Sequence, residues 1–523
     1  MPTLDWIGKD KVINHHLDVP YHVLERQYSF DETGQHEEDN DSENMIIHGD
    51  NLIALKSLLP RYEGRIKCIY IDPPYNTGNE GWVYNDNVND PRIKKWLGEV
   101  VGKEEEDLSR HDKWLCMMYP RLKLLQRLLA DDGFIFVSID VFEYANLKCL
   151  MDEIFGASNF RNCIAVRRGI KNVQAQFDEV QALSLGHEYI YLYSKNPSSK
   201  LPKLSKAFEV EKAGKWDTFW RGTDRPTMRY EIFGNCPESG QWRWEKGRAR
   251  KAIDNYERFL SLYADEYELD DYYIEHLMAT NEKLDFVRKN EMGTIQYYVP
   301  PQTGKLLSDN WMDILLSGSY AGFDTEKNVL LLDRIIGWIT SGDDIILDSF
   351  AGSGTTAHAV LNMNKEHGNN CKYILIEMMD YADSLTADRV KRVITGKERK
   401  KTVEGTGGNF SYYELGEELM KDGRLNETIS PEKIREYIYF TETKNPPEKK
   451  PDEPYFLGTY VGTAYYFYYE RSELTALNRE FLHTVKTRAD AYVIYADMCT
   501  LSERELEKYH ITFKKIPRDI TKL

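Results

Sequence analysis

An acid, two prolines and a tyrosine follow directly on a run of strand-forming residues: Asp72, Pro73, Pro74 and Tyr75 come after Ile66–Ile71. Such a run predicts a buried strand, and open α/β sheets bind ligands just past the carboxyl ends of their strands. Two prolines fix φ and remove two backbone donors, so the turn is stiff and its carbonyls can accept hydrogen bonds. A rigid turn with an acid, bare carbonyls and a ring suits a flat molecule that carries an amino group. An ordinary proline-rich strand end would look the same over four residues.

A second predicted strand, Ile345–Leu347, leads into a glycine-rich turn and then into a helical pattern over 355–365. Glycines let the backbone approach a ligand closely, and a helix N-terminus favours a negative group. Glu377 ends the next predicted strand, at the distance from the turn where nucleotide-binding sheets place an acid that bonds ribose hydroxyls. The candidate cofactor-binding residues here are Asp348, Phe350, Gly352, Gly354, Thr355 and Glu377.

Asp-Pro-Pro-Tyr together with Asp-x-Phe-x-Gly-x-Gly resembles the amino-methyltransferases of DNA, which use S-adenosyl-L-methionine (AdoMet). The Pro-Pro motif precedes the glycine-rich motif, an order that resembles the β class of this family. The surrounding residues are most similar to the modification subunits of type III restriction-modification systems. The resemblance covers roughly 45–200 and 311–400. It implies a circularly permuted, Rossmann-like, doubly wound α/β sheet and catalysis without a metal.

The resemblance also implies roles for single residues. Asp72 and the Pro73 carbonyl would accept the two amino hydrogens of a base that has left the duplex, and Tyr75 would stack on it. In the family, Asp at this position usually accompanies N6 of adenine. N4 of cytosine stays open, since both bases carry an amino group beside a ring nitrogen. Asp50 would lie near the adenine ring of AdoMet, or would cap a helix, for which Asp is favoured. The family often has Lys-Pro where this chain has Lys327-Asn328, so a cofactor role for Lys327 does not follow.

The alternation of predicted strands and helices favours a parallel, doubly wound sheet. The prediction divides the chain into a polar N-terminal tail (1–44), a catalytic half of the core (45–199), a target-recognition insertion (200–310), a cofactor-binding half (311–403) and a C-terminal domain (404–523). The last segment reads as a small α/β module after a charged, proline-rich linker. This module could dock another subunit, or it could be a plain folded core without a docking surface.

The net charge of −17 argues against a nucleic-acid partner, but residues 161–260 hold 19 Lys and Arg against 12 Asp and Glu. Within 200–310, tryptophans and arginines interleave, and such residues contact phosphates, read guanine edges and stack on bases. In the family, this insertion recognises the double-stranded DNA target. A solvated insertion with structural tryptophans is the alternative. The candidate DNA-binding residues are Arg167, Arg168, Lys171, Arg221, Arg225, Arg229, Trp242, Arg243 and Arg248.

Other functions fit less well. Gly352-x-Gly354-x-x-Ala357 with Glu377 satisfies a dinucleotide fingerprint, so an NAD-dependent dehydrogenase is one alternative. It leaves Asp72–Tyr75 unexplained. A non-catalytic DNA-binding protein with a decayed core is another alternative. Both motifs look intact, which argues against such decay. No Pro-Cys dipeptide supports a 5-methylcytosine enzyme, and no Gly-Lys-Ser/Thr supports an ATPase. The resemblance therefore implies a homodimer with a possible separate ATP-dependent restriction subunit.

Cysteine spacing and hydropathy indicate the cellular compartment in which the protein is expected. The seven cysteines form no CxxC pair, which is typical of a reduced, cytoplasmic protein. The first residues lack the apolar stretch of a signal peptide, and no apolar run approaches the ~18 residues of a membrane span.

Overall fold

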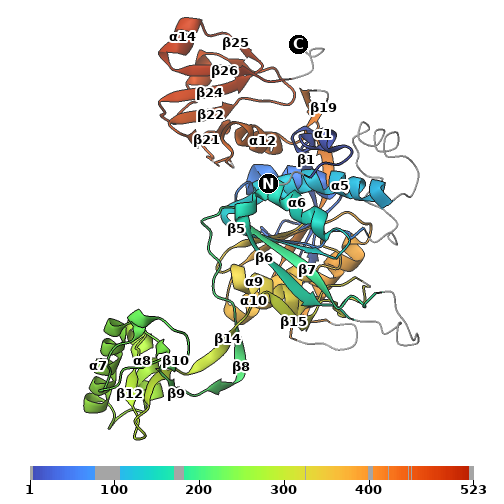
Figure 1. The fold of residues 1–523 in the computed structure, drawn as a ribbon. Coiled ribbons are helices and arrows are strands. Elements are labelled where there is room, and N and C mark those ends of the chain that lie inside the picture. Colours follow the sequence, from blue (N-terminus) through green and yellow to red (C-terminus); the bar gives the residue numbers. More distant parts are fainter. Residues whose placement is uncertain are drawn as a thin grey trace. The chain divides into compact units, whose positions relative to one another are not determined.

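The computed structural model describes residues 4–76, 107–169, 182–323, 325–397, 404–421, 423–445, 447–448 and 450–517 (Figure 1). The chain forms two compact units, one comprising Met1–Pro202 with Asp309–Leu523 and the other Lys203–Ser308. Lys171 lies outside the described residues. All seven cysteines are free thiols.

The first unit is built on an 11-stranded mixed sheet in the order β15-β6-β7-β5-β4-β16-β17-β3-β18-β1-β2. Neighbours from β5 to β18 run parallel, whereas β7 and β1 run antiparallel to the strands beside them. The expected parallel sheet is therefore its centre, with antiparallel strands towards both edges. Its strands are β1 (His22–Asp31), β2 (Gly34–His36), β3 (Met45–His48), β4 (Ile66–Ile71), β5 (Leu129–Ile139), β6 (Phe160–Arg167), β7 (His187–Ser194), β15 (Asn310–Leu315), β16 (Ile345–Asp348), β17 (Lys372–Glu377) and β18 (Phe410–Glu418).

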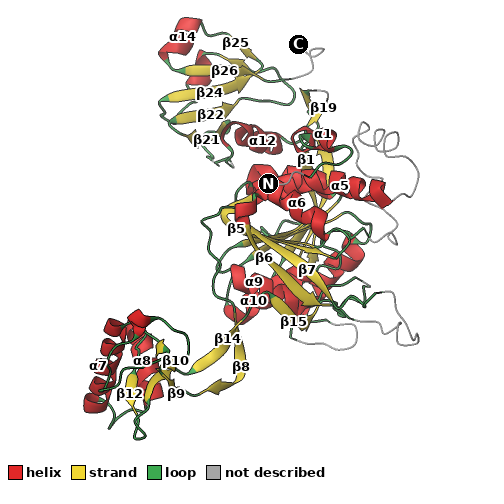
Figure 2. Ribbon diagram, viewed as in Figure 1, coloured by secondary structure: helices red, strands yellow, loops and turns green. Residues whose placement is uncertain are grey.

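Helices cover both faces of this sheet (Figure 2). On one face α5 packs against α3 and α6, and on the other α10 packs against α9 and α11. The central strands are accordingly apolar on both sides, as in β4, where the adjacent residues Cys68 and Ile69 face opposite sides and are both fully buried. The helices are α3 (Asn51–Tyr62), α5 (Asp107–Leu128), α6 (Tyr144–Phe155), α9 (Val329–Ile339), α10 (Thr355–His367) and α11 (Asp388–Thr395).

Two predicted boundaries are wrong. Residues 1–44, expected to be a polar tail, supply β1, which pairs with β18, and the short helices α1 (Lys9–Val12) and α2 (His15–Asp18), which pack on α5. In turn, β18 comes from the segment assigned to a C-terminal domain and pairs with β3. Only one end of β1, around Phe30, is buried, so its sequence lacks the apolar pattern of a core strand.

The C-terminal segment adds a second sheet in the order β21-β22-β24-β26 to the first unit. Its strand β22 runs parallel to β24 and antiparallel to β21. Its elements are α12 (Pro431–Thr443), β21 (Phe456–Tyr460), β22 (Thr463–Phe467), α13 (Arg479–Leu482), β24 (Ala491–Ala496), α14 (Glu503–Lys508) and β26 (Ile511–Lys515), with two small strand pairs, β19 (Met420–Lys421) with β20 (Arg424–Leu425) and β23 (Ala476–Leu477) with β25 (Met498–Cys499).

The second unit, Lys203–Ser308, has its own aromatic core, in which Phe219 stacks on Trp242. Its first and last strands, β8 and β14, pair antiparallel with each other. Its elements are β8 (Ser205–Lys212), β9 (Lys215–Thr218), β10 (Trp220–Arg221), β11 (Gln241–Trp242), α7 (Lys246–Leu262), α8 (Leu269–Thr280), β12 (Val287–Lys289), β13 (Ile295–Val299) and β14 (Gln302–Leu306). Among the residues that the structure describes in either unit, no helix is both long and apolar enough to span a membrane.

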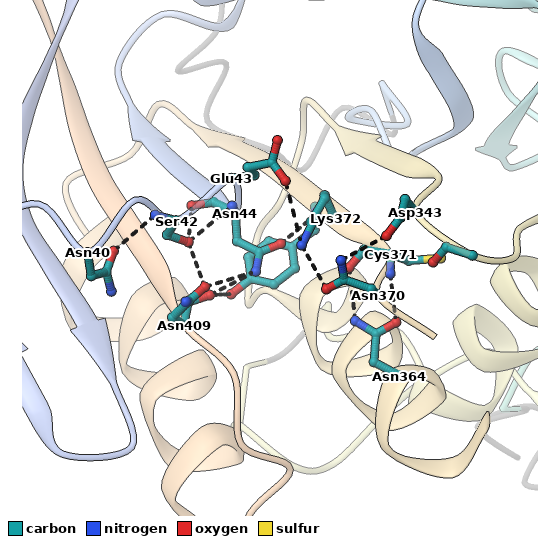
Figure 3. Close-up of polar contacts among 12 residues, drawn as sticks. Asn40, Ser42, Glu43, Asn44, Asp343, Asn364, Asn370, Cys371, Lys372 and Asn409 are labelled. Carbon is teal, nitrogen blue, oxygen red and sulfur yellow. Dashed lines mark hydrogen bonds and ion pairs between the residues drawn. The ribbon is translucent and has the colours of Figure 1, made fainter. Parts of the chain in front are cut away.

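The amino ends of β3, β17 and β18 are joined by a network of amide side chains (Figure 3). Asn44 donates through Nδ2 to the Asn409 carbonyl at 2.9 Å and accepts the Tyr373 N–H at 3.0 Å. Asn364 of α10 bonds both the N–H (3.0 Å) and the carbonyl (2.9 Å) of Cys371. These side chains satisfy backbone groups where three neighbouring strands begin, so they fix the register of the sheet.

Candidate active site

The two turns predicted to carry the chemistry leave neighbouring strands. β4 and β16 pair in parallel, with Leu347 opposite Ile69. Because parallel strands end at the same edge, Asp72–Tyr75 and Asp348–Thr355 emerge side by side although they lie far apart in the sequence. This edge of an open sheet is where such folds bind ligands.

Asp72 and Tyr75 contact each other directly. The Tyr75 hydroxyl donates to Oδ1 of Asp72 at 2.7 Å. The ammonium of Lys327 lies 3.0 Å from the same oxygen and donates to the Tyr75 hydroxyl at 2.6 Å. Burial raises the pKa of Tyr75 well above its ordinary value, and the charge of Asp72 adds to the rise. The phenol is therefore a neutral donor at physiological pH.

The carbonyls of the two prolines differ in whether they already accept a hydrogen bond. The Trp114 indole donates to the Pro74 carbonyl at 2.7 Å, and this tryptophan is fully buried in α5. None of the described residues donates to the Pro73 carbonyl. One carbonyl of the turn thus anchors it, and the other is available as an acceptor beside Asp72.

A buried carboxylate holds the end of this turn. Asn76 follows Tyr75 in a left-handed conformation (φ 60°), which Asn tolerates better than most residues. Its side-chain amide donates to Glu143, whose carboxylate also accepts from Asn146 (2.8 Å) and lies 2.6 Å from Nδ1 of His111. Burial raises the pKa of Glu143. The turn is therefore fixed at Trp114 and again at Asn76.

The glycine-rich turn needs its glycines. Gly352 and Gly354 have φ of 50° and 78°, a region that disfavours other residues. A Cβ on Gly354 would lie 3.1 Å from the Thr386 carbonyl oxygen. Both positions therefore favour glycine, and the lack of a Cβ lets a ligand approach this backbone closely.

Two acids hold the same turn together. Asp348 accepts the Phe350 N–H at 3.0 Å and the Thr356 hydroxyl at 2.5 Å, and burial raises its pKa to about 7. Glu377 accepts the Gly352 N–H at 2.7 Å, and burial raises its pKa. Glu377 thus reaches the turn from the end of β17, and its predicted bond to ribose hydroxyls stays a prediction.

The remaining predicted cofactor residues are engaged within the protein. Asp50 caps α3 by accepting the N–H groups of Leu52 (2.8 Å) and Ile53 (3.4 Å). The Thr355 hydroxyl lies 2.9 Å from the guanidinium of Arg389, which is fully buried and pairs with Glu326 at 2.9 Å. Asp50 therefore acts as a helix cap in this structure, and the predicted contact of Asp50 with a cofactor stays a prediction.

These residues fit a nucleoside cofactor. The turn has no Cβ at Gly352 or Gly354, and α10 begins at Thr355. Glu377 ends β17, and Asp50 follows the neighbouring strand β3. Close backbone approach and an acid for hydroxyl groups are the parts that such a ligand requires. The described residues contain no group of three His, Cys, Asp or Glu side chains placed to bind a metal.

The predicted DNA-binding residues of Lys203–Ser308 divide into exposed and engaged side chains. Arg221 and Arg225 are exposed. Arg229 is paired with Asp224, and Arg248 with Asp285 at 2.6 Å. Arg243 donates to the Thr218 carbonyl at 3.0 Å. Within the large unit, Arg167 is exposed at the end of β6 and Arg168 lies 3.4 Å from Glu188.

The prediction that Trp242 contacts DNA does not fit its position. Its side chain is buried against Phe219, and its indole donates to the Tyr230 carbonyl at 2.7 Å. It is a core residue of the insertion, because β11 turns it inwards. The neighbouring strand instead exposes Trp220, 43 % accessible.

Four residues at or near the Asp72–Tyr75 turn were given no site role from the sequence. Lys327, just before α9, pairs with Asp72, and Glu188, near the start of β7, lies 3.8 Å from Lys327. Asn76 and Glu143 meet at the start of α6. Only Asn76, directly after the motif, carried a local signal, since Asn is common where φ is positive. The pairing of Lys327 with Asp72 depends on tertiary structure alone.

Comparison with known proteins agrees with this geometry. A family model described as DNA methylase, for N6 and N4 methyltransferases, matches residues 66–387. The chain is 34 % identical to the Mod subunit of the type III restriction-modification enzyme StyLTI of Salmonella typhimurium, over 65 % of this chain and 53 % of the relative. It is 31 % identical to the probable HindVI Mod subunit of Haemophilus influenzae, over 73 % and 55 %.

A type II relative is covered more fully. The chain is 31 % identical to the methyltransferase M.KpnI of Klebsiella pneumoniae, over 65 % of this chain and 81 % of that protein. The chain spans only about half the length of the two type III subunits. The family model nevertheless covers both turns and everything between them, so this chain belongs to the DNA methylase family.

Proposed function

We propose that this protein transfers a methyl group from AdoMet to N6 of adenine in double-stranded DNA, as the modification subunit of a type III restriction-modification system. The observation that carries the proposal is the placement of Asp72–Tyr75 beside the glycine-rich turn on the paired strands β4 and β16. An amino-group acceptor and a nucleoside-binding turn then share one edge. The type III assignment is supported by the Mod subunits among the relatives.

When bound, AdoMet supplies a methyl group on a positively charged sulfonium. The chain contributes orientation: Asp72 and the Pro73 carbonyl accept the two amino hydrogens of the base and turn its nitrogen towards the methyl group. Asp72 accepts a hydrogen bond in the ground state, because an amino proton is far too weakly acidic to be removed there. The proton leaves with or after transfer. Positioning and electrostatics supply most of the acceleration.

Cytosine N4 is the second candidate, because the family model spans both chemistries. Methylated DNA is digested to nucleosides and separated by mass. We expect N6-methyladenine, and a dominant N4-methylcytosine peak would overturn the adenine assignment. The same protein should bind AdoMet and not NAD. Binding of NAD alone would favour a dehydrogenase, and DNA binding without either cofactor would favour a non-catalytic protein.

We also propose that Lys203–Ser308 recognises the DNA target through its exposed arginines. Replacing Arg221 or Arg225 with Gln should weaken binding and lower the slope of log affinity against log salt by about one per phosphate contact. Arg479→Gln is the control, because this exposed arginine is paired with Glu505 at 2.6 Å and lies in the C-terminal segment, outside the proposed recognition unit. Unchanged affinity and specificity after both exposed arginines are replaced would remove the assignment.

The remaining inferences concern topology and assembly. The order of the motifs along the chain supports a circular permutation, since the half that carries Asp72–Tyr75 precedes the half with the glycine-rich turn. We further propose a homodimer that docks a separate ATP-dependent restriction subunit, in the cytoplasm. A monomeric mass at micromolar concentration would count against the dimer. Failure of a purified restriction subunit to co-migrate would count against the docking.

A further inference from the structure

We propose that Lys327 is a positioning residue for methyl transfer: together with Tyr75 it holds Oδ1 of Asp72, so that Oδ2 faces the amino group of the base. This inference rests on the proposed function. Lys327 carries no local sequence signal for this role.

The contacts form a closed triangle. Lys327 Nζ is 3.0 Å from Asp72 Oδ1 and 2.6 Å from the Tyr75 hydroxyl, which itself donates to Oδ1 at 2.7 Å. The ammonium also lies 4.9 Å from the centroid of the Tyr75 ring. Among the described residues, none donates to Asp72 Oδ2. Two donors thus occupy one carboxylate oxygen, and the other oxygen keeps its capacity to accept.

Glu188 keeps the ammonium in place. Its Oε2 lies 3.8 Å from Lys327 Nζ, is buried, and receives no hydrogen bond from the described residues. Its Oε1 lies 3.4 Å from Arg168. The four charges alternate along the row Arg168, Glu188, Lys327 and Asp72. Without Lys327, two largely buried carboxylates would face each other, an arrangement that costs stability.

The backbone of Lys327 is equally constrained. It forms a bridge with Ser317, and a Cβ on Gly318 would lie 2.5 Å from its carbonyl oxygen. The next residue, Asn328, caps α9 by accepting the Leu330 N–H at 3.0 Å. Asn328 stands where the family often has proline, and its cap fixes the start of the helix by other means. The side chain of Lys327 therefore starts from a rigid point.

Orientation of the carboxylate decides the rate. The Asp72 carboxylate can rotate about its Cβ–Cγ bond. Two donors on Oδ1 restrict this rotation more than one donor does. A misplacement of about 1 Å at a reacting group can cost ~10²-fold in rate. The expected signature of Lys327 is therefore a change in the rate of transfer without a change in binding.

The test is a double-mutant cycle in single-turnover methyl transfer to duplex DNA. Lys327→Met should lower the rate ~10²-fold while dissociation constants for AdoMet and DNA stay within about twofold. Tyr75→Phe should lower it less, because stacking persists. The double variant should be slower than either by much less than the product of the two losses, since both side chains act on one oxygen. Lys327→Arg should restore part of the rate.

Controls keep the test decisive. Lys365→Met removes a lysine of α10 paired with Glu404 at the far end of the helix, and should transfer at the wild-type rate. If Lys327→Met unfolds, Lys327→Met with Glu188→Gln removes both charges and should still be slow. Three results would each overturn the role. The rate losses of Lys327→Met and Tyr75→Phe could multiply in the double variant, Lys327→Met could transfer at the wild-type rate, or it could lose AdoMet binding selectively. An inactive wild-type protein would instead refute the proposed function.

Discussion

The two edges of the central sheet satisfy the same backbone requirement with different chemistry. At the amino edge, Asn44 and Asn364 bond the loops that precede three strands, and neutral amides do most of this work (Figure 3). At the carboxyl edge, the buried acids Asp348, Glu377 and Glu143 hold the turns. Amides satisfy buried polar groups without the desolvation cost of a charge. Carboxylates carry that cost, so the buried acids mark the edge at which the ligand sites are proposed.

The strongest test removes the acceptor at the carboxyl edge. Asp72→Ala should lower single-turnover methyl transfer ~10³-fold, since it deletes an interaction that matters most in the transition state. Binding of AdoMet and DNA should persist, as measured by calorimetry and by electrophoretic mobility. Loss of AdoMet binding in this variant would show that the edge does not separate acceptor from cofactor.

The cost of buried charge predicts a pH dependence. Burial raises the pKa of Asp348 from 3.8 to about 7, so between about pH 4 and pH 7 the folded protein holds a proton that the unfolded chain has lost. Stability should therefore fall as pH rises through this window, by up to about 4 kcal/mol from this group, and stay level above it. Urea unfolding of Asp348→Asn should show a shallower decline. An unchanged slope would remove Asp348 as its source.

Filling the glycine-rich turn should affect binding and not acceptor chemistry. Gly352→Val places a β-branched residue at φ 50°, where it is strained, on a backbone expected to lie against the cofactor. AdoMet affinity should fall ~10²-fold, as estimated from the free energy of such backbone strain. DNA affinity should be unchanged in a mobility-shift assay. Near-normal AdoMet binding would place the cofactor elsewhere.

The smallest effect is expected at the amino edge, and on stability alone. Asn44→Ala leaves the Tyr373 N–H without its acceptor, at a cost of about 1–3 kcal/mol in the free energy of unfolding. Methyl transfer per folded molecule should equal that of the wild type. Asn370→Ala, at an exposed position of the same edge, should change stability by less than about 0.5 kcal/mol. A slowed transfer in Asn44→Ala would contradict the division of roles between the edges.

Local sequence predicted the working edge better than the rest of the fold. Strand-terminating prolines and glycines with positive φ are short-range signals, so Asp72–Tyr75 and Gly352–Gly354 could be placed at strand ends. β1 could not, because only one end of it is buried and its partner β18 is almost 400 residues away. Lys327 could not either, because its contact with Asp72 joins two segments that lie far apart in the sequence. Trp242 was predicted to contact DNA but is buried, because interleaved Trp and Arg residues do not reveal which side chains face inwards.

The antiparallel pairing of β8 with β14 places the entry and exit of the insertion next to each other, with Ser205 opposite Leu306. A segment whose two ends meet can be exchanged as a cassette, because the chain on either side keeps its course whatever is spliced between. If this unit recognises the target as proposed, new specificities would arise by recombination at this strand pair while the methyl-transfer site is inherited unchanged. We expect that an insertion from a relative, joined at the same two strands, would redirect methylation to the donor's sequence.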